Sequence, residues 1–272
     1  MWLALGRRIP ASGSRGKPLR LLVLYGQTLR RAARSPYPLL GVTLAPLATL
    51  WLLCQLFGAL PHALRTFPVT SYLDFVAPAL AMASGLPFAL WCGRSVGRDA
   101  DSRFLDQLLS APVPRAFPAL GALFAGGTGA AFSALLVCTV SLAAGTAITG
   151  GIRGLFALTG LAGVLGLIYA GLAWILTALA PNRRAAGAIL VVVLVSTLLL
   201  TDLLLPNGLL PFWLREAANL NPLTAAIDGA RAVSWPRVDW GRWERNILVL
   251  LAPALVVTIG ATALPRPLRG ER

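Results

Sequence analysis

The stretch that decides the fold runs from residue 116 to residue 182: AFPALGALFAGGTGAAFSALLVCTVSLAAGTAITGGIRGLFALTGLAGVLGLIYAGLAWILTALAPN. Its 67 positions contain a single charged residue, Arg153. A helix that crosses the hydrocarbon core of a bilayer needs about 20 apolar residues. The stretch therefore predicts two membrane-spanning helices that turn over at Arg153.

The composition of the whole chain agrees with a polytopic membrane protein. Of its 272 residues, 57% are hydrophobic and 12% charged, and the mean hydropathy is +0.73. Such values lie outside the range of soluble domains. Cys54, Cys92 and Cys138 all fall in apolar runs, where cysteine acts as a small hydrophobe, so we expect neither a disulfide nor a metal site. The single histidine, His62, is expected near a membrane interface.

We predict an all-α integral membrane fold with six transmembrane helices. The expected spans are residues 38–60, 73–93, 116–146, 154–180, 185–206 and 246–264. The glycines near residue 150 indicate that the end of the third span is a turn. The short connections 147–153 and 181–184 predict that spans 3 and 4, and spans 4 and 5, are tight antiparallel neighbours.

Basic residues fix the predicted orientation. With both termini on one side of the membrane, that side collects 17 of the 24 basic residues, and the other side has 7. The positive-inside rule therefore places both termini in the cytoplasm. The net charge of +14 then reflects the basic N-terminal region 1–37 facing anionic lipid, and no nucleic-acid partner is expected. Residues 265–272 form the cytoplasmic tail.

Residues 17–34 have apolar side chains at helical spacing on one face and Arg20, Gln27, Arg31 and Arg34 on the other. This pattern predicts an amphipathic helix that lies in the cytoplasmic interface before the first span. A plain soluble helix is the alternative.

No motif for catalysis is present. The chain has no G-x-x-x-x-G-K-[ST] phosphate loop, no H-E-x-x-H, no Cys-x-x-Cys and no G-x-S-x-G. We therefore expect neither an enzyme, such as a lipid transferase, nor a cofactor on this chain. An ion-coupled secondary transporter needs ionisable groups within its helices. Asp74 and Asp202 are the candidates, and both lie near the outer ends of their predicted spans.

The loop from residue 94 to residue 115 contains a narrow apolar stripe. Phe104, Leu105, Leu108 and Leu109 share one face of a helix that Pro112 and Pro114 end. Asp99, Asp101, Arg103, Asp106 and Gln107 surround the stripe. An amphipathic cytoplasmic helix requires a partner, either lipid or a groove on another protein. The alternative is a helix packed on its own bundle.

The segment DADSRFLDQLLSAPVPR, residues 99–115, resembles the signature loop of ABC-2 type permeases, the membrane subunits of ABC exporters. The daunorubicin/doxorubicin-resistance type is the nearest likeness. Ala100 and Arg103 depart from the usual Arg and Gly of that loop. A second region is similar to the family's segment before the last span, through Pro211, Trp213, Asn221, Pro222, Asp228 and Arg231. Residues 72–75 and Pro78 resemble the opening of the family's second span.

The resemblance implies that the loop helix is a coupling helix docked on a separate ATPase. This chain would then bind no ATP or Mg²⁺ itself. It also implies short re-entrant helices within the outer segment 207–245. For residues 222–233 we expect a helix with Asn221 as N-cap and Pro222 as first residue, in which Asp228 and Arg231 pair at i, i+3.

We therefore interpret the chain as a six-span permease of an ABC exporter. It would form a dimer with an identical or paralogous permease and bind two copies of an ATPase. Its substrate would be an amphipathic drug-like or lipid-like molecule moved outward across the plasma (inner) membrane of a bacterium. Relatives that export polysaccharide or lipo-oligosaccharide, and the ion-coupled transporter, are the alternative functions. The substrate-binding residues are unknown.

Overall fold

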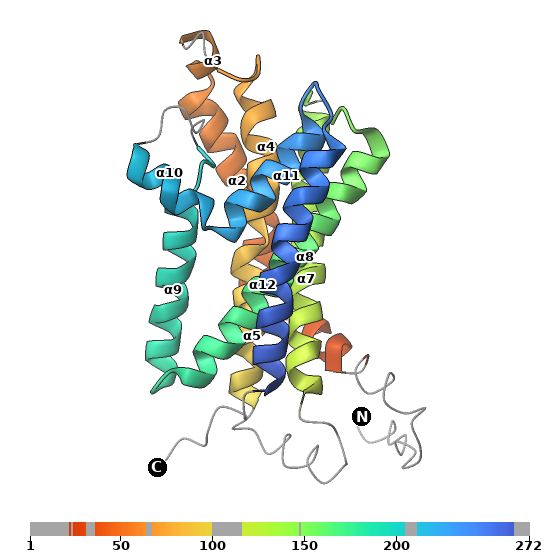
Figure 1. Ribbon diagram of the computed structural model, residues 1–272. Coiled ribbons are helices and arrows are strands. Elements are labelled where there is room, and N and C mark those ends of the chain that lie inside the picture. The colour runs from red at the N-terminus through yellow and green to blue at the C-terminus, as the bar shows by residue number, and fades with distance from the viewer. Residues whose placement is uncertain are drawn as a thin grey trace, which may run out of the picture.

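A computed structural model describes residues 22, 24–30, 36–63, 67–99, 116–146, 148–204 and 211–263, with side chains at most of these positions. Within these ranges the chain forms helices and no strands (Figure 1). The helices are α2 (Pro36–Phe57), α3 (Leu60–Ala63), α4 (Tyr72–Ser84), α5 (Leu86–Asp99), α7 (Phe117–Ala143), α8 (Gly151–Leu179), α9 (Arg183–Leu199), α10 (Phe212–Asn219), α11 (Pro222–Ser234) and α12 (Trp240–Ala263).

Five helical segments in the described part of the chain are long and apolar enough to cross a membrane. They are Thr43–Ala63, Tyr72–Ser95, Phe117–Ala143, Gly151–Leu179 and Trp240–Ala263. These segments match the first, second, third, fourth and sixth predicted spans. The fifth predicted span, 185–206, corresponds to α9, whose 17 residues are at the lower limit of a spanning length. The count of six spans thus stays a prediction.

Two predicted boundaries were wrong. The last helix was expected to begin at residue 246, but α12 begins at Trp240 and so includes Arg242, Glu244 and Arg245. These side chains are exposed at the end of the helix, where charge does not have to enter hydrocarbon. The fifth helix was expected to reach residue 206, but α9 ends at Leu199, and residues 201–204 are a bent, non-helical segment.

The second span lies at the centre of the bundle. In the apolar stretch of this span 89% of the residues are buried, whereas only 17% are buried in the corresponding stretches of the spans at α2 and α12. The span is interrupted between α4 and α5 at Gly85, because Pro87 has no N–H to bond the carbonyl of Ala83. A Cβ on Gly85 would lie 2.4 Å from Cα of Ala130, so α4 and α7 are in backbone contact at this point.

Helices α7 and α8 are close neighbours, as the short connection 147–153 predicted, and glycines such as Gly127 and Gly166 allow their close approach. The turn before α8 includes Gly145, whose φ of +100° favours glycine. By contrast, α9 buries only Ala186 and Leu190. The tight packing expected of spans 4 and 5 is therefore wrong for most of α9, and Figure 1 shows α9 at the edge of the bundle.

The glycines at the contact between α7 and α8 are expected to be necessary for stability. A Cβ at Gly126 would lie 2.5 Å from Cβ of Ala170, and one at Gly166 would lie 2.5 Å from Cβ of Ala130. We expect Gly126→Ala and Gly166→Ala each to destabilise the protein by about 1–3 kcal/mol, the usual cost of overpacking. Gly160→Ala is the matched control, since its new methyl group would meet open space. Thermal unfolding in detergent measures the difference, and equal midpoints for all three variants would contradict it.

Residues 24–30 are helical, which confirms that part of the predicted amphipathic helix. Tyr25 donates a hydrogen bond from its hydroxyl to Oγ1 of Thr128 at 3.3 Å, and Leu29 packs with it against the α5–α7 contact. Leu22, on the predicted apolar face, is 60% exposed. The described part of this helix therefore rests partly on the bundle. Its remaining residues lie outside the described ranges.

The connections between the helices lie at the two ends of the bundle. Arg94 donates a hydrogen bond to the carbonyl of Arg183 at 3.3 Å, so the end of α5 and the start of α9 share one end. The backbone N–H of Gly150 donates to the carbonyl of Val233 at 3.0 Å, which joins the α7–α8 turn to the end of α11. Figure 1 shows these as opposite ends. We call them the α5 end and the α11 end.

Candidate functional site around helix α11

Helix α11 begins as its sequence predicts. Asn221 is the N-cap, and its side-chain oxygen accepts a hydrogen bond from the N–H of Leu223 at 3.0 Å. Pro222 occupies the first helical position, where a missing N–H costs nothing. The expected helix over 222–233 is thus confirmed, with one further residue at its end.

The N-cap side chain also connects three helices. Its amide nitrogen donates to the carbonyls of Thr197 and Leu200, at 2.8 and 2.9 Å, at the end of α9. On the α8 side, the hydroxyl of Tyr169 lies 3.2 Å from Oγ1 of Thr197 and 3.5 Å from the side-chain oxygen of Asn221. Buried carbonyls at the end of a helix need such donors, and Asn221 supplies two.

Helix α11 runs inside the bundle and not over its surface. Asn221, at its start, lies beside Tyr169 in the middle of α8, and Val233, near its end, is bonded to Gly150 just before α8 begins. Ten of its 13 residues are buried. Together with the shorter α10 it forms a V whose point lies at the end of α9 (Figure 1).

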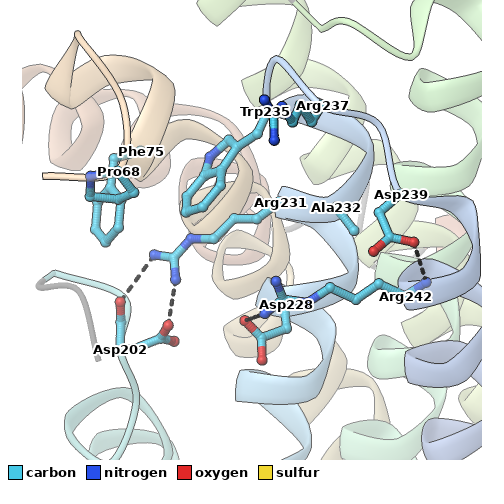
Figure 2. Close-up of a pocket in the computed structure, with 10 residues that line it drawn as sticks. All are labelled: Pro68, Phe75, Asp202, Asp228, Arg231, Ala232, Trp235, Arg237, Asp239 and Arg242. Carbon is cyan, nitrogen blue, oxygen red and sulfur yellow. Dashed lines mark hydrogen bonds and ion pairs between the residues drawn. The ribbon is translucent and has the colours of Figure 1, made fainter. Parts of the chain in front are cut away.

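A buried ion pair joins the same segments. The guanidinium of Arg231 on α11 binds the carboxylate of Asp202, just after α9, and donates a second bond to the carbonyl of Asp202 at 3.0 Å. The two side chains are 5% and 2% exposed. The guanidinium lies 4.1 Å from the ring centre of Phe75 on α4 (Figure 2). A desolvated cation over an aromatic face adds attraction to the ion pair.

The predicted pairing of Asp228 with Arg231 was wrong. Arg231 binds Asp202, while Asp228 binds Arg242 on α12 at 3.2 Å. A contact between residues three apart on a helix contributes only a few tenths of a kcal/mol. The buried Arg231 therefore takes the partner that can be desolvated with it. The second pair is more accessible, with Arg242 50% and Asp228 26% exposed.

These charges surround a cavity of about 330 Å³. Three arginines and three aspartates line it, with Phe75, Trp235 and Pro68 as its apolar wall (Figure 2). Burial raises the pKa of the Asp228 carboxyl, with a contribution from the nearby Asp202 charge, against the opposing effect of Arg242. Burial lowers the pKa of Arg231, and Asp202 opposes the shift. The two ion pairs join α11 to the segment after α9 and to α12, and the contact of Arg231 with the Phe75 ring adds α4.

A neighbouring cavity of about 350 Å³ shares Pro68 and Trp235 with the first. Asp74, in the first turn of α4, lines it together with Thr70, Thr149 and Ser234. Asp74 and Asp202 thus differ. Both line a cavity, but the first is half-buried, whereas the second is 2% exposed and bound to Arg231.

The other predicted site residues are found in different places. Pro211 precedes α10 and Trp213 is 65% exposed on it, away from the ion pairs. Asp99 is the last residue of α5. The remaining coupling residues, Asp101, Arg103, Phe104, Leu105, Asp106, Leu108 and Leu109, lie outside the described ranges. Sequence reasoning missed Tyr169, Thr197 and Phe75, whose partners are far away along the chain. Within the described ranges, no three His, Cys, Asp or Glu side chains are grouped as a metal site.

A bundle of long apolar helices with a charged network at one end is the architecture of a multi-pass membrane protein. The family model of ABC-2 type transporters matches residues 20–235, which is most of the chain. The chain therefore belongs to the ABC-2 type transporter family.

Two proteins from red algae are similar to it. One, from Porphyra purpurea, is 28% identical over 221 residues, which cover 79% of this chain and 74% of the relative. The other, from Pyropia yezoensis, is 28% identical over 234 residues, covering 82% and 79%. Both are described as inferred transport permeases, under the name ycf38.

Proposed function

We propose that this chain is the membrane subunit of an ATP-driven exporter and moves an amphipathic, drug-like or lipid-like molecule outward across a bacterial plasma membrane. The observation that carries the proposal is the family match, which covers both the loop 94–115 and the segment 211–231. Members of this family normally work with an ATPase partner. ATP and Mg²⁺ would then be bound by that partner.

The described geometry supports a mechanical connection. Helix α5 continues from the buried centre of the bundle to Asp99, within the coupling loop 94–115. A rigid helix transmits a displacement along its axis, so movement of the loop would reach the contacts around Gly85 and Ala130. In the proposed complex, two ATPase copies bind the loops of two permeases, identical or paralogous.

In the proposed exporter, the α11 end of the bundle would close the pathway along which the substrate crosses the membrane. The V formed by α10 and α11 has the shape expected of a re-entrant segment, because α11 starts beside the middle of α8 and ends beside its first residue. Opening would require the ties of α11 to Asp202, Thr197 and Leu200 to loosen. The ion-coupled alternative is less well supported, since Asp202 is enclosed in an ion pair.

Membrane orientation has its own prediction. Single cysteines introduced at Ser14 and Ser102 are expected to be shielded from an impermeant thiol reagent in intact cells, and a cysteine at Asn207 is expected to react. The asymmetry of basic residues is the reason. Permeabilised cells, in which all three positions become accessible, are the control. Labelling of Ser14→Cys from outside intact cells would reverse the proposed orientation.

Co-expression tests the proposed assembly. Purified alone, the chain is expected neither to bind nor to hydrolyse ATP. Expressed with its partner ATPase, the chain is expected to co-purify with that ATPase as a stable complex. ATP hydrolysis by the isolated chain, or failure of that ATPase to bind it, would contradict the proposal.

A further inference from the structure

A third concave surface lies between α8 and α12, and it shares no lining residue with the charged cavity. It is an open groove of about 610 Å³. Its walls are mainly apolar and aromatic, and its lining includes Arg153, Phe156, Gly160, Val164, Trp243 and Ile247. Figure 1 shows the two helices beside each other.

The groove follows from side-chain size on one face of α8. Its α8 residues recur at helical spacing, and one of them is Gly160, where an added Cβ would meet open space. From Arg153 to Val164 the helix rises about 16 Å. Since the hydrocarbon core is about 30 Å thick, the groove has the depth of about one leaflet.

The only charged side chain of the groove lies at its end. Arg153 is in the first turn of α8, at the α11 end, and no hydrogen bond or ion pair to its guanidinium occurs among the residues that the structure describes. Trp240 and Trp243, whose rings are 6.1 Å apart in an edge-on arrangement, lie on the facing wall. Tryptophan and arginine at this level are typical of the headgroup region.

We propose that this groove binds one phospholipid with an anionic headgroup from the leaflet on the α11 side. The phosphate region lies at Arg153, and one acyl chain lies along Gly160 and Val164. The combination of a lone cation, an apolar channel and a length of one leaflet fits a lipid better than a protein helix. The site is separate from the cavity at Arg231 and does not depend on the ATPase.

Native mass spectrometry of the full-length protein tests this proposal. Protein reconstituted in nanodiscs of palmitoyl-oleoyl phosphatidylglycerol is released in the gas phase, and the retained lipids are counted. Parallel samples contain palmitoyl-oleoyl phosphatidylcholine. We expect the wild-type chain to retain one phosphatidylglycerol more than Arg153→Ala, whose affinity falls about fivefold, and no such difference with phosphatidylcholine.

Gly160→Leu is the second variant, because its Cβ would meet open space and its larger side chain should occupy the groove and displace the acyl chain. Arg215→Ala is the matched control, since Arg215 is exposed on α10 outside the groove. Retention of phosphatidylglycerol is expected to fall in Gly160→Leu and stay unchanged in Arg215→Ala. Equal retention in all four proteins, or equal retention of phosphatidylcholine by the wild-type chain, overturns the proposal.

A disulfide experiment tests whether a second copy of the chain, and not a lipid, occupies the groove. Phe156→Cys, in a background where Cys54, Cys92 and Cys138 are Ala, places one thiol in the groove, because Phe156 is 70% exposed. We expect the variant to stay monomeric on non-reducing gels after oxidation of membranes. Efficient formation of a disulfide-linked dimer would show that the groove is an interface between copies and would overturn the lipid assignment.

Discussion

Replacing Asp202 by Asn is expected to destabilise the protein by about 3–5 kcal/mol, the largest effect we expect from a single substitution among the described residues. The reason is that Arg231 would keep its charge in a site where it is 5% exposed, without the carboxylate that it binds directly. Removing one member of a buried ion pair costs this much because the other charge stays desolvated. Unfolding of the purified protein in detergent, by heat or denaturant, measures the change.

Two further variants distinguish the loss of stability caused by breaking the buried ion pair from the loss that any substitution could cause. Arg242→Ala breaks the more exposed pair with Asp228 and is expected to cost no more than about 1 kcal/mol. The double variant Asp202→Leu with Arg231→Met removes both charges and should recover most of the lost stability. If Asp202→Asn destabilises the protein no more than Arg242→Ala does, the account of the ion pair is wrong. The account is also wrong if the double variant is less stable than Asp202→Asn.

The second large effect is expected in the coupling loop. Leu105→Asp should lower recovery of the ATPase with the permease by about tenfold or more and abolish export, while the protein still inserts into the membrane. Burying one leucine is worth about 1.5–3 kcal/mol, and an aspartate in its place would bring an unpaired charge into the contact. Leu108→Asp, on the same stripe, is expected to behave alike.

Gln107→Ala, on the polar face of the same predicted helix, is the matched control and should leave both recovery and export nearly unchanged. Pull-down of the ATPase at equal membrane abundance of each variant gives the comparison. Unchanged recovery and unchanged export with Leu105→Asp would mean that the stripe packs on its own bundle.

The sequence was a good guide wherever local chemistry decides structure. Uncharged runs gave the positions of the long helices, because hydrocarbon admits few other residues. Asn221 and Pro222 located the start of α11 through the needs of a helix N-terminus. Even the end of the third span, at the turn containing Gly145, was visible in the glycines near it.

Features that depend on distant contacts could not be predicted. The partner of Arg231 is 29 residues away, and Phe75 lies on another helix, so a reading of spacing along α11 selected Asp228 instead. Asp202 was assigned to a spanning helix and considered for proton coupling, although it lies after the end of α9 in the ion pair. Tyr169 gave no signal at all, because its polar group finds partners only when α8, α9 and α11 pack together.

Transport by reconstituted protein tests the central claim most directly. The chain and its ATPase are placed in liposomes, and movement of a fluorescent amphiphile is followed with ATP or with an imposed proton gradient. We predict that ATP drives transport, that the gradient alone does not, and that Asp74→Asn keeps ATP-driven transport. Transport by the permease alone in response to the proton gradient, lost in Asp74→Asn, would contradict the assignment as an ATP-driven exporter.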